Sequence, residues 1–201
     1  MSPGTSKMAS PRLRTPLIAA AIALNVVLAT IVQVVKLPVY IDAVGTILAV
    51  LLLGLWPGVI VGIVSFLFAA LLISPVYVYF IGTQICIALY TFIVAKYLAG
   101  FSSWPKLVVT GVGLGVLAGV VSAPIIVAVF GGASGTGRDL LTALLASSGQ
   151  QIISSVLLSG AASEPLDKTL QCALAHTIIL GLPANIRKLL DNPILRRNYK
   201  Y

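Results

Sequence analysis

Long apolar runs almost free of charge fill the chain between a basic beginning and a basic end. Hydrophobic residues make up 59% of the 201 residues and charged residues only 9%, against about 25% in a soluble domain. A water-soluble fold of this length could not hide so many apolar side chains, because a folded surface needs polar residues to cover it. The sequence therefore predicts an all-α integral membrane protein with a single membrane domain.

Most of the positive charge lies at the two ends. Of the 13 basic residues, eight flank the apolar block: Lys7, Arg12, Arg14, Arg187, Lys188, Arg196, Arg197 and Lys200. This distribution is typical of cytoplasmic segments that meet anionic lipid headgroups, and it argues against a nucleic-acid partner. We expect residues 1–15 and 184–201 to be basic cytoplasmic ends of a multi-pass protein of the plasma membrane.

The apolar runs divide the membrane domain, residues 16–183, into successive elements. We expect helices near 16–35, 41–53, 59–73, 77–98 and 107–130, a polar outer element over 140–162 and a last helix over 168–183. The first helix ends before Pro38, because the residue before a proline is disfavoured in a helix. A tight turn over Gly54–Gly58 separates the second run from the third.

The charges also predict how often the chain crosses the bilayer. Two cytoplasmic ends require an even number of crossings, and four crossings bring Lys96 and Lys106 to the cytoplasm while a fifth places Arg138 outside. The serine- and glutamine-rich segment 140–162 then fits best as a re-entrant or non-spanning element on the outer side. Six transmembrane helices result.

Acidic and amide side chains near the predicted outer side are the candidates for binding a solute. The residues are Asp42, Tyr79, Thr83, Gln84, Gln150, Gln151, Glu164 and Asp167. Polar groups at membrane depth are costly without a partner, and these donors and acceptors suit a small, flat, polar solute. Alternatives remain open: Asp42 as a helix N-cap, Glu164–Thr169 as a helix start, the glutamines as helix–helix contacts and the tyrosines as interfacial anchors.

Signatures of catalysis and of metal binding are missing from the sequence. His176 is the single histidine and has no second ligand near it in sequence, while Cys86 and Cys172 lie in apolar runs without ligand spacing. The chain has no HExxH, no GxxxxGK[ST] and no serine–histidine–carboxylate arrangement. We therefore expect neither an enzyme nor a cofactor in this chain, and we expect His176 to be a packed, hydrogen-bonded residue.

Two segments present small residues at the four-residue spacing of close helix contacts. The first is Ala19-x-x-x-Ala23, and the second is the glycine-rich segment Gly111–Gly119. Small side chains let two helix backbones approach closely in a membrane. Each segment is thus predicted to pack against another helix, of this chain or of a partner.

Several of these strings together resemble the substrate-binding S components of energy-coupling factor (ECF) vitamin transporters. They are Leu37-Pro-Val-Tyr-Ile-Asp-Ala-Val-Gly-Thr46, Leu53-Gly-Leu-Trp-Pro-Gly58, Tyr79-Phe-Ile-Gly-Thr-Gln84, Ser122-Ala-Pro124, Phe130-Gly-Gly132 and Glu164-Pro-Leu-Asp-Lys168. Ala19-x-x-x-Ala23 is similar to the alanine motif by which S components dock onto their coupling subunit. The resemblance covers most of the membrane block and is to an uncharacterised branch of that group.

The resemblance implies a six-helix S-component bundle with a solute site near the outer surface. It further implies partners, namely a transmembrane coupling subunit and two ATPase subunits that use the ATP. The absence of a phosphate-binding loop in this chain agrees with that division of labour. The cargo would be a vitamin-like or nucleobase-like heterocycle.

Two other classes of function stay open on the sequence. The same branch resembles membrane sensor regions, so a stand-alone sensor or scaffold that binds a ligand and signals to a partner is an alternative. A secondary carrier or channel is disfavoured, because no charge is firmly placed at mid-membrane and no inverted halves are visible.

Overall fold

The computed structural model describes residues 11–135, 138–149, 151–190 and 192–199, and in this part the chain is all-helical. The helices are α1 (Pro11–Val35), α2 (Val44–Leu53), α3 (Leu55–Leu72), η1 (Pro75–Phe80), α4 (Ile81–Ile93), η2 (Val94–Leu98), α5 (Trp104–Phe130), α6 (Asp139–Ser147), α7 (Ile152–Gly181), α8 (Ala184–Leu190) and α9 (Pro193–Asn198). The elements η1 and η2 are a 3-10 turn and a π-helical turn that extend α4 at its two ends.

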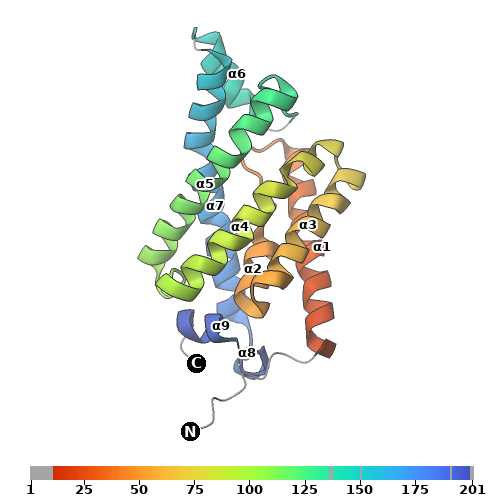
Figure 1. Cartoon of the computed structure of the whole chain (residues 1–201), viewed down its shortest axis with the longest axis vertical. Coiled ribbons are helices and arrows are strands. Elements are labelled where there is room, and N and C mark those ends of the chain that lie inside the picture. The colour runs from red at the N-terminus through yellow and green to blue at the C-terminus, as the bar shows by residue number, and fades with distance from the viewer. Residues whose placement is uncertain (1–10, 136–137, 150, 191, 200–201) are drawn as a thin grey trace.

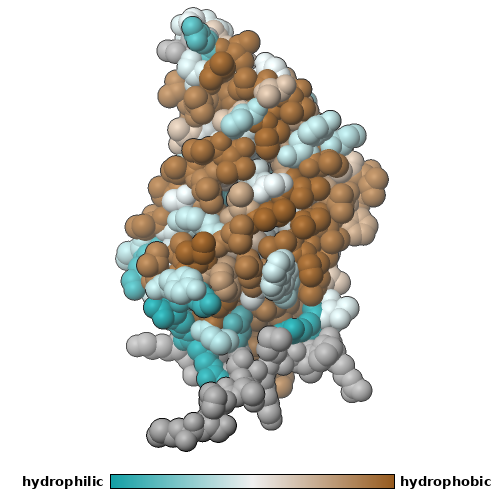
Figure 2. Space-filling view, viewed as in Figure 1, coloured by the Kyte–Doolittle hydropathy of each residue, from teal (hydrophilic) through white to brown (hydrophobic). Residues whose placement is uncertain are grey.

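Four helical stretches are long and apolar enough to cross a bilayer. They are Leu13–Val35, Leu55–Leu72, Pro75–Leu98 and Trp104–Phe130. Large apolar side chains such as Leu71 and Val109 are exposed on these stretches, and Figure 2 shows apolar residues covering most of the visible body while polar residues gather near its lower end. Lipid is the solvent that suits such a surface, so the chain is a multi-pass membrane protein.

Successive long helices run in alternating directions along the molecule (Figure 1). The beginning of α1 lies at the same end as α8 and α9, which we call the basic end. The segment that links α1 to α2, together with η1 and α6, lies toward the opposite end, which we call the α6 end. The bundle therefore places its basic helix termini together, away from the loops that close its other end.

Helix α2 is a ten-residue helix in which every residue is buried. It packs against α1, α3, α4 and α7, and a side chain at Gly45 would collide with the backbone of α1 at Ala21. A single residue, Gly54 with φ of +99°, separates α2 from α3. The turn expected over Gly54–Gly58 is thus shorter than predicted, because Pro57 is tolerated in the first turn of α3.

Helices α5 and α7 form the most extensive helix–helix contact of the described bundle. Glycine residues allow their two backbones to lie close together. The backbone of α5 at Gly111 meets Thr169, and at Gly115 it meets Glu164 and Pro165. A Cβ atom at Gly115 would lie 2.5 Å from the carbonyl oxygen of Glu164. The predicted close-packing face of this glycine-rich segment is confirmed, with α7 as its partner.

The structure differs from the expectation for residues 140–162 and 168–183. A short helix, α6, is followed by one continuous helix of 30 residues, α7, that includes Glu164 and Pro165. The helix start expected at Glu164 is therefore wrong. Proline costs a helix one hydrogen bond, but Pro165 faces the open backbone of Gly115, and the charged residues beside it find partners on other elements.

Candidate functional site

A narrow cavity opens toward the α6 end of the bundle. Its walls come from the α1–α2 linker, α3, η1, α4, α5, the loop before α6 and α7: Tyr40, Asp42, Phe66, Val76, Tyr77, Phe80, Thr83, Gln84, Ile87, Ser122, Ser134, Glu164 and Lys168. The space not filled by protein atoms is about 530 Å³ with the mouth included, but a water molecule can centre in only about 50 Å³ of it. The cavity, which we call the slot, thus holds little free space and suits a small molecule.

A cluster of buried charges forms one wall of the slot. The Nζ atom of Lys168 lies 2.6 Å from Asp167, 3.4 Å from Asp42 and 3.8 Å from Glu164. Burial raises the pKa of the Asp42 carboxyl above its ordinary value, and the nearby Lys168 ammonium opposes that rise. One lysine therefore lies among three carboxylates.

Arg138 supplies a second cation from the loop before α6. Its guanidinium is 2% exposed and contacts α7 at three points: Glu164 Oε1 at 3.3 Å, the Val156 carbonyl at 2.6 Å and Ser159 Oγ at 3.2 Å. A side chain at Gly160 would occupy the space of this guanidinium. The contacts fix the loop before α6 to α7 beside the slot.

Two buried oxygen atoms on the slot have no hydrogen-bond partner among the described residues. They are Oε2 of Glu164 and Oγ1 of Thr83. Lys168, at 3.8 Å from that Glu164 oxygen, is beyond hydrogen-bond distance. Buried polar atoms are rarely left unpaired, because each lost hydrogen bond costs about 1–3 kcal/mol. Both atoms lie where a solute in the slot could pair with them.

Asp167 supports the slot without lining it. The carboxylate accepts hydrogen bonds from the backbone N–H groups of Tyr40 and Ile41 and from the amide of Gln171, while Gln171 in turn accepts from Ala43 N–H. These contacts hold Ile41 at φ of +46°, a conformation that β-branched residues rarely adopt. The α1–α2 linker that carries Tyr40 and Asp42 is therefore fixed by α7.

A chain of hydrogen bonds anchors Gln84, which lines the slot from α4. Asn25 donates to Thr46 and Ser65, and Thr46 donates to Oε1 of Gln84 at 2.9 Å. The Gln84 amide donates weakly, at 3.4 Å, to the Asp42 carbonyl. Gln84 thus makes the helix–helix contact that was one of its two predicted roles. Its amide also borders the slot.

Aromatic rings form the remaining walls. Phe66 and Tyr77 contact edge to face with ring centroids 5.2 Å apart, and Lys168 Nζ lies 5.6 Å from the Tyr40 ring centroid. Phe80, also on the wall, stacks on Phe130 of α5. Flat aromatic surfaces beside a few polar groups are the usual lining of a small-molecule site.

The structure brings together four of the residues expected to bind a solute. Asp42, Thr83, Gln84 and Glu164 line one slot, although they come from three separate parts of the chain. Asp167 lies directly behind them with 0% exposure. These four residues thus share one cavity, and their role in binding a solute stays a prediction.

The remaining expected residues lie elsewhere. The Tyr79 ring is 53% exposed and packs on Phe130 outside the slot, and Gln151 is an exposed residue at the start of α7. Gln150 lies outside the described residues. Ala19 and Ala23 are exposed on α1.

Lys168 and Tyr40 line the slot, and Arg138 contacts Glu164 beside it, but the sequence did not predict a role for these three residues. Lys168 follows Glu164 by four residues, the spacing that places two side chains on one helix face, and this was the available signal. Arg138 has no such spacing to another charged residue on a helix, and an arginine in a loop is usually exposed to solvent. Among the described residues no group of His, Cys, Asp and Glu could hold a metal ion.

Comparison of the chain with protein-family models, with curated proteins and with solved structures found no match in any of the three.

Proposed function

We propose that this chain is the membrane-embedded substrate-binding component of an ECF-type importer. The observation that carries the proposal is the slot toward the α6 end, where buried Glu164 and Thr83 each keep one oxygen atom without a partner among the described residues. A solute with N–H or O–H groups would satisfy both atoms and lie between aromatic rings. Polar groups held at membrane depth in this way indicate a binding role.

The solute class follows from the lining. Two carboxylates and one ammonium border the slot, so hydrogen-bond donors or a positive charge on the solute are favoured. The small free space selects a small molecule, and the rings of Tyr40, Tyr77 and Phe66 offer surfaces on which a flat one could stack. A small nitrogen heterocycle, vitamin-like or nucleobase-like, meets all three conditions.

The loop before α6 provides a cover for the slot. Ser134 of this loop lines the slot, the Gly135 carbonyl accepts from Gln33 of α1 at 3.1 Å, and Asp139 accepts from the backbone N–H groups of Ser134 and Gly135. Release of these contacts would open the mouth, and a bound solute that touches Ser134 would favour the closed loop by differential affinity.

The proposal also includes six crossings of the membrane, with both chain ends in the cytoplasm. Separate partner subunits supply the energy. The α6 end would face the cell exterior, while the exposed Ala19 and Ala23 on α1 offer a smooth face for the coupling subunit. Two ATPase subunits would supply ATP hydrolysis, and this chain would perform no catalysis of its own. Located in the plasma membrane, it would capture the solute outside and pass it inward.

Native mass spectrometry of the detergent-purified chain is the decisive experiment. We expect one small heterocyclic molecule retained per chain, or one captured from a panel of vitamins and nucleobases. Uptake of that molecule should require ATP and the partner subunits. A chain that stays bare across the panel would contradict the proposal, and ligand-dependent signalling without uptake would favour the sensor alternative.

A matched pair of threonine variants tests the slot itself. Thr83 and Thr91 both lie on α4 with a buried hydroxyl that has no partner among the described residues, but only Thr83 lines the slot. We expect Thr83→Val to weaken solute binding about tenfold, since a lost hydrogen bond in a buried site costs about 1 kcal/mol or more. Thr91→Val should bind as the wild type does, and equal affinity in all three proteins would remove Thr83 from the site.

A further inference from the structure

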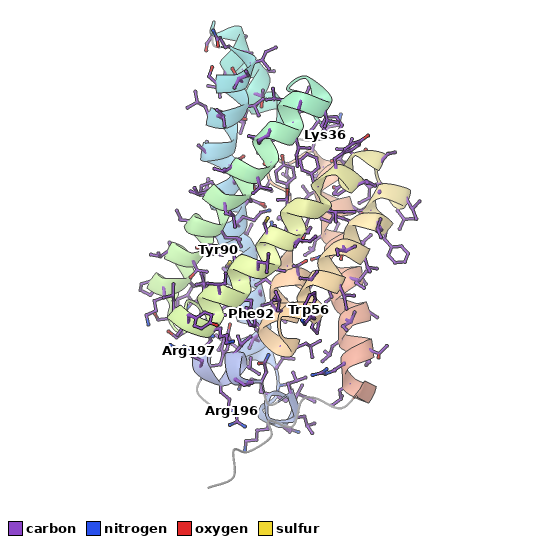
Figure 3. All side chains as sticks on the ribbon, in the orientation of Figure 1. Lys36, Trp56, Tyr90, Phe92, Arg196 and Arg197 are labelled. Atoms are coloured by element: carbon purple, nitrogen blue, oxygen red, sulfur yellow. The ribbon has the colours of Figure 1, made fainter. Side chains whose placement is uncertain are left out.

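A second cavity lies at the basic end, far from the slot. Its lining comes from the start of α5, the end of α7, α8 and α9: Ser102, Ser103, Trp104, His176, Leu180, Arg187, Arg197, Asn198 and Tyr199. The space not filled by protein atoms is about 700 Å³ with the mouth included. Figure 3 shows Arg196 and Arg197 at this end of the molecule and Lys36 toward the other.

The wall of this cavity is built from ordered polar and aromatic groups. His176 Nδ1 lies 3.0 Å from the Tyr199 hydroxyl, as expected of a packed histidine, and the Trp104 ring meets the His176 ring edge to face. Arg197 donates to the Tyr97 carbonyl at 2.9 Å, and Asn198 is held by the carbonyls of Ala95 and Ile194. Arg197 is thus held on a fixed frame.

The described residues of the lining carry positive charge, which favours an anion. Arg187 and Arg197 both line the cavity, and no carboxylate of the described residues does. Four of the five acids lie elsewhere in the fold, and the fifth, Asp191, is outside the described residues. The hydroxyls of Ser102 and Ser103 add neutral donors at the start of α5. Two guanidinium groups and two hydroxyls are the donors that bind a phosphate group.

Apolar residues that continue from the cavity indicate that the phosphate belongs to a lipid. Trp104 is 54% exposed at the rim, a position that tryptophan prefers at the interface of a bilayer. Val108 and Val112 follow it at four-residue spacing and are also exposed, so the three form one stripe along α5. An acyl chain would lie along this stripe while its headgroup entered the cavity.

We propose that this cavity binds the phosphate headgroup of one anionic phospholipid. Basic pockets between helices at the cytoplasmic side of a membrane are suited to such headgroups. The bound lipid would bridge α5, α7, α8 and α9 and so fix the C-terminal helices to the bundle. The inference does not depend on the identity of any solute in the slot.

Native mass spectrometry of the full chain, titrated separately with phosphatidylglycerol and phosphatidylcholine, tests this site. The wild type should retain one phosphatidylglycerol per chain in preference to phosphatidylcholine, a measurement that needs no variant. Arg187→Gln with Arg197→Gln should weaken phosphatidylglycerol binding about tenfold or more. Lys188→Gln with Arg196→Gln removes the same charge from α8 and α9 outside the cavity lining and should leave the affinity unchanged.

Three results would overturn the proposal. Equal weakening in both double variants would show general attraction to a basic surface, and equal binding of both lipids would show no headgroup site. Inorganic phosphate that binds without lipid, with the same dependence on Arg187 and Arg197, would show a site for a free anion. Thermal unfolding of both double variants confirms that each is folded before the affinities are compared.

Discussion

The ion pair between Arg138 and Glu164 joins a loop to a helix at a place where neither charge meets water. The two side chains are 2% and 4% exposed and lie 3.3 Å apart. Burial of a charge is costly, so removal of one partner is more damaging than removal of both. The pair therefore specifies where the loop before α6 lies relative to α7.

Arg138→Met should destabilise the folded protein by roughly 3–5 kcal/mol, because Glu164 would keep a buried charge without its arginine. The double variant, Arg138→Met with Glu164→Met, should lose less than the sum of the two single variants. Thermal unfolding in detergent measures the stability of the two single variants and the double variant. Strictly additive losses would mean that the two side chains do not depend on each other.

For single residues, the sequence indicated which polar side chains are unusual in an apolar run, but it did not indicate what each side chain contacts. Asp42, Thr83, Gln84 and Glu164 were selected because polar groups are costly in an apolar run, and they share one slot. Tyr79 was selected by the same rule, but its side chain is exposed on the surface of the bundle. Sequence position cannot tell these cases apart, because the direction of a side chain depends on how helices rotate against their neighbours.

The contact between α5 and α7 is the element on which the slot depends, since α7 carries Glu164, Asp167 and Lys168. Gly115 allows the α5 backbone to lie against the α7 backbone at Pro165. Any side chain there would push α7 away and shift one wall of the slot.

Gly115→Ala should lower stability by about 1–3 kcal/mol, the usual cost of overpacking, and should weaken solute binding as well. Gly119→Ala is the control, since a Cβ atom there would lie 3.7 Å from Glu164 Cγ, an ordinary contact. Thermal unfolding and solute titration of both variants check the prediction. If Gly115→Ala kept the stability of the wild type while Gly119→Ala lost stability, the result would contradict this packing.

Helix boundaries were predicted well where apolar runs end at glycine or proline and poorly where charge interrupts them. Near Glu164 the sequence has proline and three charged residues, a pattern typical of a helix start. In the fold, Arg138 and Asp42 meet those charges from other elements, so the helix continues. The partners are distant in sequence, and local rules could not include them.

At the scale of the whole molecule, the basic end and the α6 end lie on opposite sides of the apolar body (Figure 1). The charge distribution predicts that the basic end faces the cytoplasm. The fold agrees that the start of α1 and the helices α8 and α9 share one end, while the direction in a membrane remains a prediction.

Cysteine labelling in intact cells tests this orientation. With Cys86 and Cys172 replaced by alanine, Ser148→Cys at the α6 end should react with a membrane-impermeant maleimide. Lys188→Cys at the basic end should react only after the cells are made permeable. Both positions are exposed, so access to the reagent decides the result. The opposite pattern would invert the proposed topology and place the slot inside the cell.

Helix α2 has a consequence for how this protein enters a membrane. Ten residues span about 15 Å, whereas the hydrocarbon core of a bilayer is about 30 Å thick. Every side chain of α2 is covered by protein, so none is available to dissolve in lipid. Alone, the segment would not be retained by a bilayer. The site that α2 occupies forms only when α1, α3, α4 and α7 surround it. Biogenesis of this protein must therefore couple insertion of α2 to assembly of the last long helix, about a hundred residues later.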